Sequence, residues 1–277
     1  AMMLLGEAGR DILYPDPGFP IYRSMAAYSG ARAVPYAVHE DLGFSFKASE
    51  ILSKVTPDTR LIILNSPGNP TGGSNRESEV CELVAGLDRF PQCAVLSDEI
   101  YSRLHFDGAQ HQTLLQFEGL RDRLIVLDGW SKTYAMTGWR LGWGIWPASM
   151  IGPATKLAIN IHSCVNAPAQ FAAQAALDGP QDAVDKMRQA FQDRRDLVHG
   201  RLNAMPGISA AKPKGAFYAF PNISALGRSS KDVQDTWLQE LGVATIAGTS
   251  FGDAGADYIR LSFANSLDNI TEALDLI

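Results

Sequence analysis

The sequence predicts an α/β fold that is built on a mainly parallel sheet and followed by a smaller α+β domain. Short apolar runs alternate with helical patterns in the first part of the chain, which is typical of right-handed βαβ units. One run, Arg60 to Asn65, is apolar without alternation, as expected of a strand buried on both faces. After Pro147 the pattern changes to longer helices and then to short strands, which indicates a second unit.

In the first part, two loops rich in proline and glycine, residues 15–20 and 65–73, separate the expected elements. Apolar runs predict strands at residues 11–14, 33–38, 60–65, 94–96 and 124–127. Periodic segments between them predict helices at residues 22–28, 47–52 and 77–87.

In the second part, helices are expected at residues 149–161 and 167–177, and Pro180 begins a long amphipathic helix. Its apolar face is formed by Val184, Met187, Phe191, Val198 and Leu202. Short strands (216–220, 243–247, 258–264) and two helices (231–241, 267–277) follow. We therefore expect a large domain over residues 1–179, and the long connecting helix and small C-terminal domain over residues 180–277.

Composition restricts the class of protein. The 277 residues carry 19% charged and 46% hydrophobic residues, as in ordinary globular proteins. The net charge of -6 argues against nucleic acid or an anionic membrane as a partner. The start, Ala1 to Leu5, is too short for a signal peptide and lacks its basic flank, so we expect a cytoplasmic protein. The same residues resemble the middle of a helix, so we also expect that the chain was cut upstream. The three cysteines lack metal-ligand spacing, so no metal site is expected.

Polar side chains follow the carboxyl ends of three separate apolar strands. These residues are Asn69, Asp98 with Tyr101, and Lys132. In parallel sheets the ligand sits outside the carboxyl ends of the strands. We therefore expect one binding site at this edge.

Lys132 and Arg140 lie in the stretch from Leu127 to Gly144, which is rich in small and aromatic residues. A lysine at the end of a buried strand is a candidate for imine formation with a carbonyl compound. An arginine in the same loop suits a phosphate. The alternative for a lysine alone is a solvated residue at a strand end.

Five motifs, in this order, resemble those of class I/II aminotransferases, the aspartate aminotransferase-like branch of fold type I pyridoxal-phosphate (PLP) enzymes. They are DPGFP (16–20), NSPGNPTG (65–72), SDEIY (97–101), SKTYAMTGWR (131–140) and YIRLS (258–262). The resemblance covers essentially the whole chain. It implies a three-layer large domain that binds PLP, amino acid and 2-oxo acid substrates, and a homodimer.

The resemblance also implies roles for individual residues. Lys132 would form the Schiff base with PLP, Asp98 would face the pyridine nitrogen, and Tyr101 and Asn69 would donate to the phenolate oxygen. A carboxylate at the pyridine nitrogen keeps the ring an electron sink. For Asp98 the alternative is a capping aspartate, for Tyr101 a half-buried aromatic and for Asn69 a turn residue. The Asn69–Pro70 bond would be cis.

The resemblance assigns the remaining candidates to the cofactor phosphate, to the substrate and to the cofactor ring. Arg140 would pair with the cofactor phosphate, and Arg260 with the substrate α-carboxylate, near Asn69. Phe19 would stack on the cofactor ring. The alternatives are a structural salt bridge for Arg260 and a core aromatic for Phe19. The segment 215–218 resembles the part of the small domain that closes on substrate.

Three features depart from the family pattern. Gly129 stands where the family often has a phosphate-binding serine, although members also use glycine there, and Trp130 beside it is unusual. The glycine/serine helix start that cradles the phosphate, and the N-terminal arm, would lie before Ala1. Dicarboxylate specialists use an arginine in the region matching 162–170, which here contains neither arginine nor lysine.

We therefore expect a transaminase that moves an amino group from an aspartate-, alanine- or aromatic-type L-amino acid to a 2-oxo acid such as 2-oxoglutarate. One alternative is a PLP-dependent C–S β-lyase on the same fold. A second is the PLP-sensing domain of a transcription regulator, and a third is an α/β domain without PLP.

Overall fold

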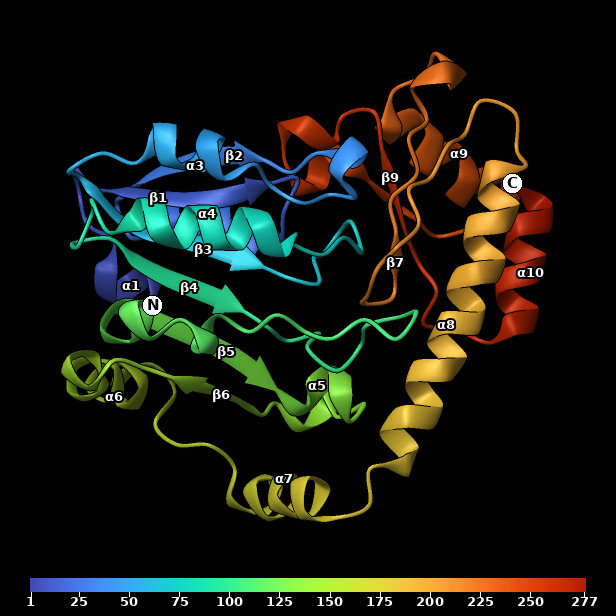
Figure 1. Cartoon of the computed structure of the whole chain (residues 1–277). Coiled ribbons are helices and arrows are strands. Elements are labelled where there is room, and N and C mark those ends of the chain that lie inside the picture. Colours follow the sequence, from blue (N-terminus) through green and yellow to red (C-terminus); the bar gives the residue numbers. More distant parts are fainter.

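The computed structural model describes residues 1–277 and confirms the predicted α/β fold with a mainly parallel sheet (Figure 1). The central sheet has six strands in the order β2-β1-β3-β4-β5-β6. Strands β1 to β5 run parallel, and β6 pairs antiparallel with β5. Their bounds are Asp11–Asp16 (β1), Arg32–Ala37 (β2), Thr59–Asn65 (β3), Ala94–Asp98 (β4), Leu124–Gly129 (β5) and Gly142–Ile145 (β6).

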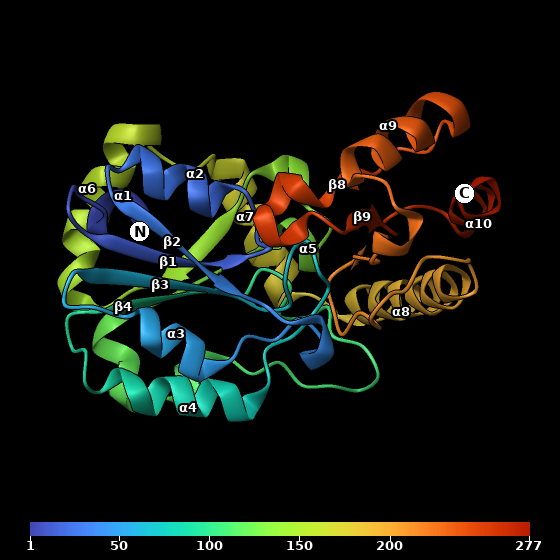
Figure 2. The same cartoon turned by 90° about the horizontal axis from the view of Figure 1, so that it is seen from above.

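Helices cover both faces of this sheet and make three layers (Figure 2). On one face lie α1 (Met2–Leu5), α2 (Ile21–Tyr28) and α6 (Ala148–His162), and on the other lie α3 (Ala48–Lys54) and α4 (Glu77–Leu87). The strands alternate their side chains between the two layers. In β3, for example, Ile62 packs in the α3–α4 core and Ile63 in the α1–α2 core. The short α5 (Trp130–Thr133) follows β5, and α7 (Ala167–Asp178) precedes the connecting helix.

The second part of the chain forms a smaller body around a three-stranded sheet. Its strands β7 (Tyr218–Ala219), β9 (Ile259–Ser262) and β8 (Ile246–Ala247) lie in that order, and all pairs are antiparallel. The helix α8 (Asp182–Asn203) runs along this body, with α10 (Leu267–Leu276) beside it and α9 (Ser230–Leu241) beyond the small sheet (Figure 1). Val184, Phe191, Val198 and Leu202 of α8 are buried, as the amphipathic pattern predicts.

Some details differ from the prediction. Strand β6 was not expected, because two glycines and a tryptophan interrupt the apolar pattern of Gly142–Ile145. Strands β7 and β8 are much shorter than expected, since the small sheet is held largely by turns and isolated bridges. Arg195 lies on the apolar face of α8 with 0% exposure, because Asp107 and the Pro213 carbonyl bind its guanidinium.

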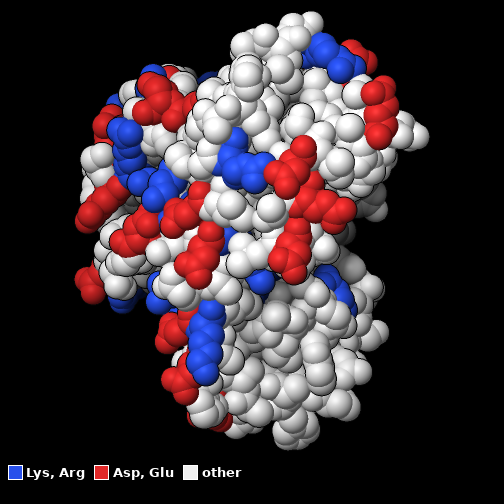
Figure 3. Space-filling model, turned by 90° about the vertical axis from the view of Figure 1, so that its right-hand side faces the viewer, with Lys and Arg blue, Asp and Glu red and all other residues white.

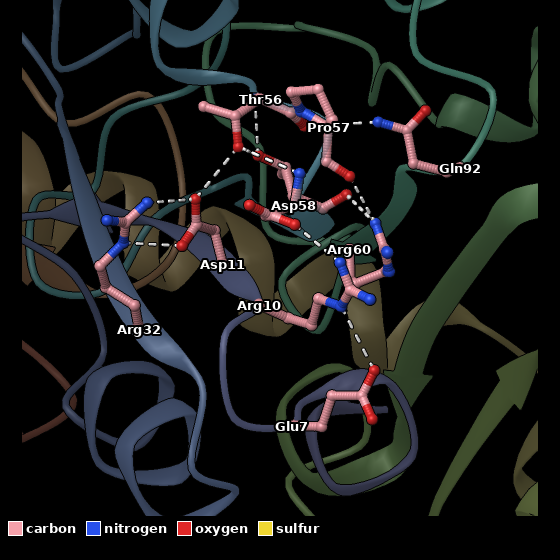
Figure 4. A network of polar contacts seen from close by, with 10 residues as sticks. Glu7, Arg10, Asp11, Arg32, Thr56, Pro57, Asp58, Arg60 and Gln92 are labelled. Atoms are coloured by element: carbon pink, nitrogen blue, oxygen red, sulfur yellow. Dashed lines mark hydrogen bonds and ion pairs between the residues drawn. The ribbon is translucent and has the colours of Figure 1, made fainter.

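A polar network closes the amino-terminal end of the sheet, opposite the carboxyl ends of the strands (Figure 4). The Asp11 carboxylate at the start of β1 accepts two 2.7 Å hydrogen bonds from Arg32, and Arg10 binds Asp58 at 2.7 Å. The Thr56 hydroxyl donates to Asp11 at 3.3 Å. These contacts pair a buried carboxylate, so the amino-terminal ends of β1 and β3 are held together without a ligand.

The surface offers no continuous basic area on the face seen in Figure 3, where acidic and basic side chains are intermingled. None of the helices is both long and apolar enough to cross a membrane.

Candidate active site

A cavity of about 480 Å³ opens at the carboxyl ends of the parallel strands. All seven residues predicted to form the site line this cavity: Phe19, Asn69, Asp98, Tyr101, Lys132, Arg140 and Arg260. They come from six places in the sequence, and Arg260 comes from the small sheet. The predicted convergence of these residues at one edge is therefore seen in the structure.

Asp98, the last residue of β4, lies at the base of the cavity and is held in place by Tyr22. The Tyr22 hydroxyl donates to Asp98 Oδ2 at 2.6 Å, and the Ile100 amide donates to Oδ1 at 3.3 Å. Burial raises the pKa of Asp98, and the hydrogen bond from Tyr22 opposes this rise. The Asn65 side chain donates to the Asp98 carbonyl at 3.1 Å and accepts from the Asn69 amide at 3.0 Å, so it ties the loop to the strand.

Lys132 is presented by α5 directly after β5. Its Nζ lies 5.4 Å from the ring centre of Phe217 and 6.0 Å from that of Tyr101. Desolvation lowers the pKa of Lys132, and the positive charges of Arg140 and Arg260 lower it further. This environment favours the neutral amine, which is the nucleophilic form.

Arg140 and Phe19 are the two exposed residues among the seven predicted residues that line the cavity. Arg140 is exposed, has a left-handed backbone (φ 54°), and donates from Nη1 to the Thr137 carbonyl at 2.8 Å. Phe19 is 42% exposed and packs edge-on against Tyr22, with ring centres 5.7 Å apart. Arg140 therefore keeps donors free for an anion, and Phe19 keeps a ring face free for a planar ligand.

Arg260 of β9 is half-buried between two aromatic rings. Its guanidinium carbon lies 4.6 Å from the ring centre of Tyr218 and 4.7 Å from that of Phe251. Arg260 Nη1 donates to Asn69 Oδ1 at 2.9 Å, and the buried Nε has no hydrogen-bond partner. Because a guanidinium only donates, this contact turns the Asn69 amide so that its NH₂ group is available as a donor. Burial lowers the pKa of Arg260.

The sequence analysis did not identify Tyr22, Asn65, Tyr218 or Phe251 as site residues. Tyr22, Asn65 and Tyr218 line the cavity, and Phe251 covers the Arg260 guanidinium. A signal existed for Tyr22, since it lies one helical turn after Phe19, and for Tyr218, which belongs to the 215–218 segment. The Asn69–Pro70 peptide bond is cis, as the resemblance implies.

Comparisons with known proteins agree with this geometry. The family model for aminotransferase class I and II matches residues 1–277. An aspartate aminotransferase of Pyrococcus horikoshii is 36% identical over 273 residues, which cover 98% of this chain and 69% of that protein. Aromatic-amino-acid aminotransferase 2 of Thermococcus litoralis is 35% identical over 267 residues, which cover 96% of this chain and 68% of that protein.

Solved structures show the same relationship. The crystal structure of an aromatic aminotransferase from Pyrococcus horikoshii OT3 matches with a TM-score of 0.95 and 35% identity, over 99% of this chain and 74% of that one. The aspartate aminotransferase from Rhizobium meliloti matches with a TM-score of 0.94 and 32% identity, over 99% and 71%. The chain belongs to the class I and II aminotransferase family and is a transaminase.

Proposed function

We propose that the cavity binds PLP through Lys132 and transfers an amino group from an L-amino acid to a 2-oxo acid such as 2-oxoglutarate. The donor would be of the aspartate, alanine or aromatic type. The observation that carries this proposal is the convergence of an amine, a carboxylate and a guanidinium, from Lys132, Asp98 and Arg260, on one cavity. The relatives named aspartate and aromatic aminotransferases support the choice of donors.

The chemistry of the residues fits PLP. Asp98 is a half-buried carboxylate without a cationic partner, and a protonated pyridine nitrogen would supply that partner. Lys132 has a lowered pKa and an aromatic surround, which suits covalent attachment to an aldehyde. Arg140 is exposed, lines the cavity and makes a hydrogen bond only to the Thr137 carbonyl, so its other donors are available to a phosphate.

When bound, PLP would supply an electron sink that makes the Cα proton of the amino acid acidic. The chain's residues do the rest. Once the substrate amine has taken its place, the Lys132 amine would be free to accept the proton from Cα and to return it to C4′ of the cofactor, because a neutral amine can accept a proton and its protonated form can donate one. Asp98 would keep the ring nitrogen protonated, and Tyr22 fixes the orientation of that carboxylate.

Arg260 would bind the α-carboxylate of either substrate through its planar fork of donors. The Asn69 amide and the Tyr101 hydroxyl would donate to the phenolate oxygen of PLP, and Phe19 would stack on its ring. The rings of Tyr101 and Phe217 lie beside the Lys132 amine and reduce its contact with water.

We further propose the division into residues 1–179 and 180–277 as two domains, since each part has its own sheet and core. A homodimer is proposed as well. Apolar side chains of α6 and α7 are exposed, among them Ile159 (57%) and Phe171 (74%), as expected of a subunit interface. Sedimentation of the protein tests this, and a monomer at micromolar concentration would contradict it.

The experiment for the proposed reaction is a transamination assay with PLP, 2-oxoglutarate and aspartate, alanine or phenylalanine as donor. We expect glutamate to accumulate with at least one donor. The Lys132→Ala variant should form no glutamate with any of them. Cystathionine without an oxo acid is the comparison: release of pyruvate there, together with no glutamate in the first assay, would contradict the proposal and favour a C–S lyase.

A further inference from the structure

Tyr218 contacts the two sides of the site at once. Its hydroxyl lies 2.9 Å from the Tyr101 hydroxyl, and its ring faces the Arg260 guanidinium at 4.6 Å. Tyr101 follows β4 of the large sheet, whereas Tyr218 and Arg260 lie on β7 and β9 of the small sheet. Tyr218 is 7% exposed and Tyr101 is 2% exposed, so neither hydroxyl exchanges its partner freely with water.

The backbone before Tyr218 is fixed against the loops that follow β3 and β4 of the large sheet. The Ala216 amide donates to the Leu104 carbonyl at 2.9 Å, and the Lys214 and Gly215 amides donate to the Gly72 carbonyl at 2.8 and 3.1 Å. Ala216 is fully buried and has a positive φ of 57°, in the left-handed region that an alanine rarely adopts. The surroundings thus hold this segment in a conformation it would not choose alone, which directs Tyr218 between Tyr101 and Arg260.

We propose that Tyr218 is a positioning residue of the transamination site: its hydroxyl fixes the Tyr101 hydroxyl, and its ring fixes the Arg260 guanidinium. The inference rests on the proposed function, in which Tyr101 serves the cofactor and Arg260 serves the substrate carboxylate. Through Tyr218 the small sheet sets the geometry of both groups.

The two contacts have different physical origins. If Tyr218 donates its proton to the Tyr101 oxygen, the Tyr101 proton is directed away from Tyr218 and into the cavity, and the chain of two hydrogen bonds strengthens each. The contact with Arg260 is a cation–π interaction that needs only the ring. The hydroxyl and the ring of Tyr218 can therefore be tested separately.

Tyr218→Phe removes the hydroxyl and keeps the ring, whereas Tyr218→Leu removes both. We expect Tyr218→Phe to weaken PLP binding about three- to tenfold, the effect of one hydrogen bond. In a Tyr101→Phe background the same change should alter PLP binding by less than about twofold, because the partner is already absent. A full effect of Tyr218→Phe in that background would overturn the hydroxyl part of the proposal.

The ring is tested with 3-phenylpropionate, a carboxylate that cannot transfer an amino group. Its affinity for the PLP-loaded protein should stay within about twofold in Tyr218→Phe and should fall about three- to thirtyfold in Tyr218→Leu. Equal affinities in the two variants would overturn the ring part. Circular dichroism and thermal unfolding check that both variants fold, and Tyr218→Met replaces Tyr218→Leu if the latter does not.

A readout without PLP separates this inference from the proposed function. The unpartnered Arg260 Nε–H should give an NMR signal in ¹⁵N-labelled protein that is shifted by the flanking rings and is absent in Arg260→Lys. Tyr218→Phe should keep its position and Tyr218→Leu should move it. Failure of the wild-type chain to bind PLP would contradict the proposed function, whereas an unmoved signal in Tyr218→Leu would contradict the positioning role itself.

Discussion

Replacing Tyr22 by phenylalanine tests how the site holds the half-buried carboxylate of Asp98. The change removes the 2.6 Å hydrogen bond to Asp98 and leaves the carboxylate with the longer bond from the Ile100 amide. Hydrogen bonds to charged groups contribute about 1.5–3 kcal/mol, and Tyr22 is only 3% exposed, so its hydroxyl binds Asp98 with little competition from water. We expect the free energy of unfolding of the PLP-free protein at pH 7 to fall by about that amount.

The pH dependence has a definite sign. Burial raises the pKa of Asp98, so between its ordinary and folded pKa the folded protein binds more protons than the unfolded chain. That contribution to stability is complete below the ordinary pKa of about 3.9 and is lost as pH rises through the folded pKa. Tyr22→Phe raises the folded pKa further, because the hydrogen bond that lowered it is gone. The destabilisation should therefore be greater at pH 7 than at pH 4.

Urea unfolding at both pH values, followed by circular dichroism, measures these differences. Tyr28→Phe is the matched control, since Tyr28 lies on the same helix and is 75% exposed, and it should change the free energy of unfolding by less than about 0.5 kcal/mol. Equal effects of the two substitutions, or a loss at pH 4 as large as at pH 7, would show that the Tyr22 hydroxyl does not stabilise the charged carboxylate of Asp98.

Two further predictions concern arginines. Arg260→Lys should lower kcat/KM for the amino donor about tenfold or more, because the planar fork is lost, whereas the exposed Arg228→Lys should not; unchanged kinetics in Arg260→Lys would remove it from carboxylate binding. Asp107→Ala should lower the free energy of unfolding by about 1–3 kcal/mol, because Arg195 is fully buried and loses hydrogen bonds of 2.7 and 3.1 Å. The control is Asp88→Ala, which removes an exposed partner of Arg123 and should lower the free energy of unfolding by less than about 0.5 kcal/mol. The hydrogen bond from Arg195 lowers the pKa of Asp107, so the contribution of this pair to stability should be present above the ordinary aspartate pKa and be lost as pH falls through the folded pKa. Urea unfolding from pH 7 to pH 3 measures this contribution. A destabilisation by Asp107→Ala no larger than that by Asp88→Ala would contradict the prediction.

The elements of the large sheet could be predicted because their apolar patterns are local. Strand β3 and helix α4 lie within a residue of the expected bounds, since burial on both faces and helical periodicity leave direct traces in the sequence. Strand β6 could not be predicted, because it pairs at the edge of the sheet and all four residues are exposed.

The site was predictable to the extent that its residues follow strand ends. Asp98 and Lys132 belong to this group, and the rule for parallel sheets places such residues at one edge. Tyr218 could not be predicted as a site residue, because its proposed role depends on a contact with Tyr101, 117 residues away, and on the docking of the small sheet. The burial of Arg195 could not be predicted, because a buried cation is stable only with partners such as Asp107, which the helical pattern does not reveal.

All the proposed roles depend on covalent attachment of PLP to Lys132 in this cavity. The direct measurement is the absorption spectrum of the protein with PLP, before and after borohydride, followed by peptide mapping. We predict a visible band that borohydride removes, a reduced pyridoxyl group on Lys132, and no such product in Lys132→Ala, whereas Lys156→Ala, which changes a lysine of α6, behaves as wild type. A pyridoxyl group on another lysine, or no band in the wild-type protein, would contradict the account.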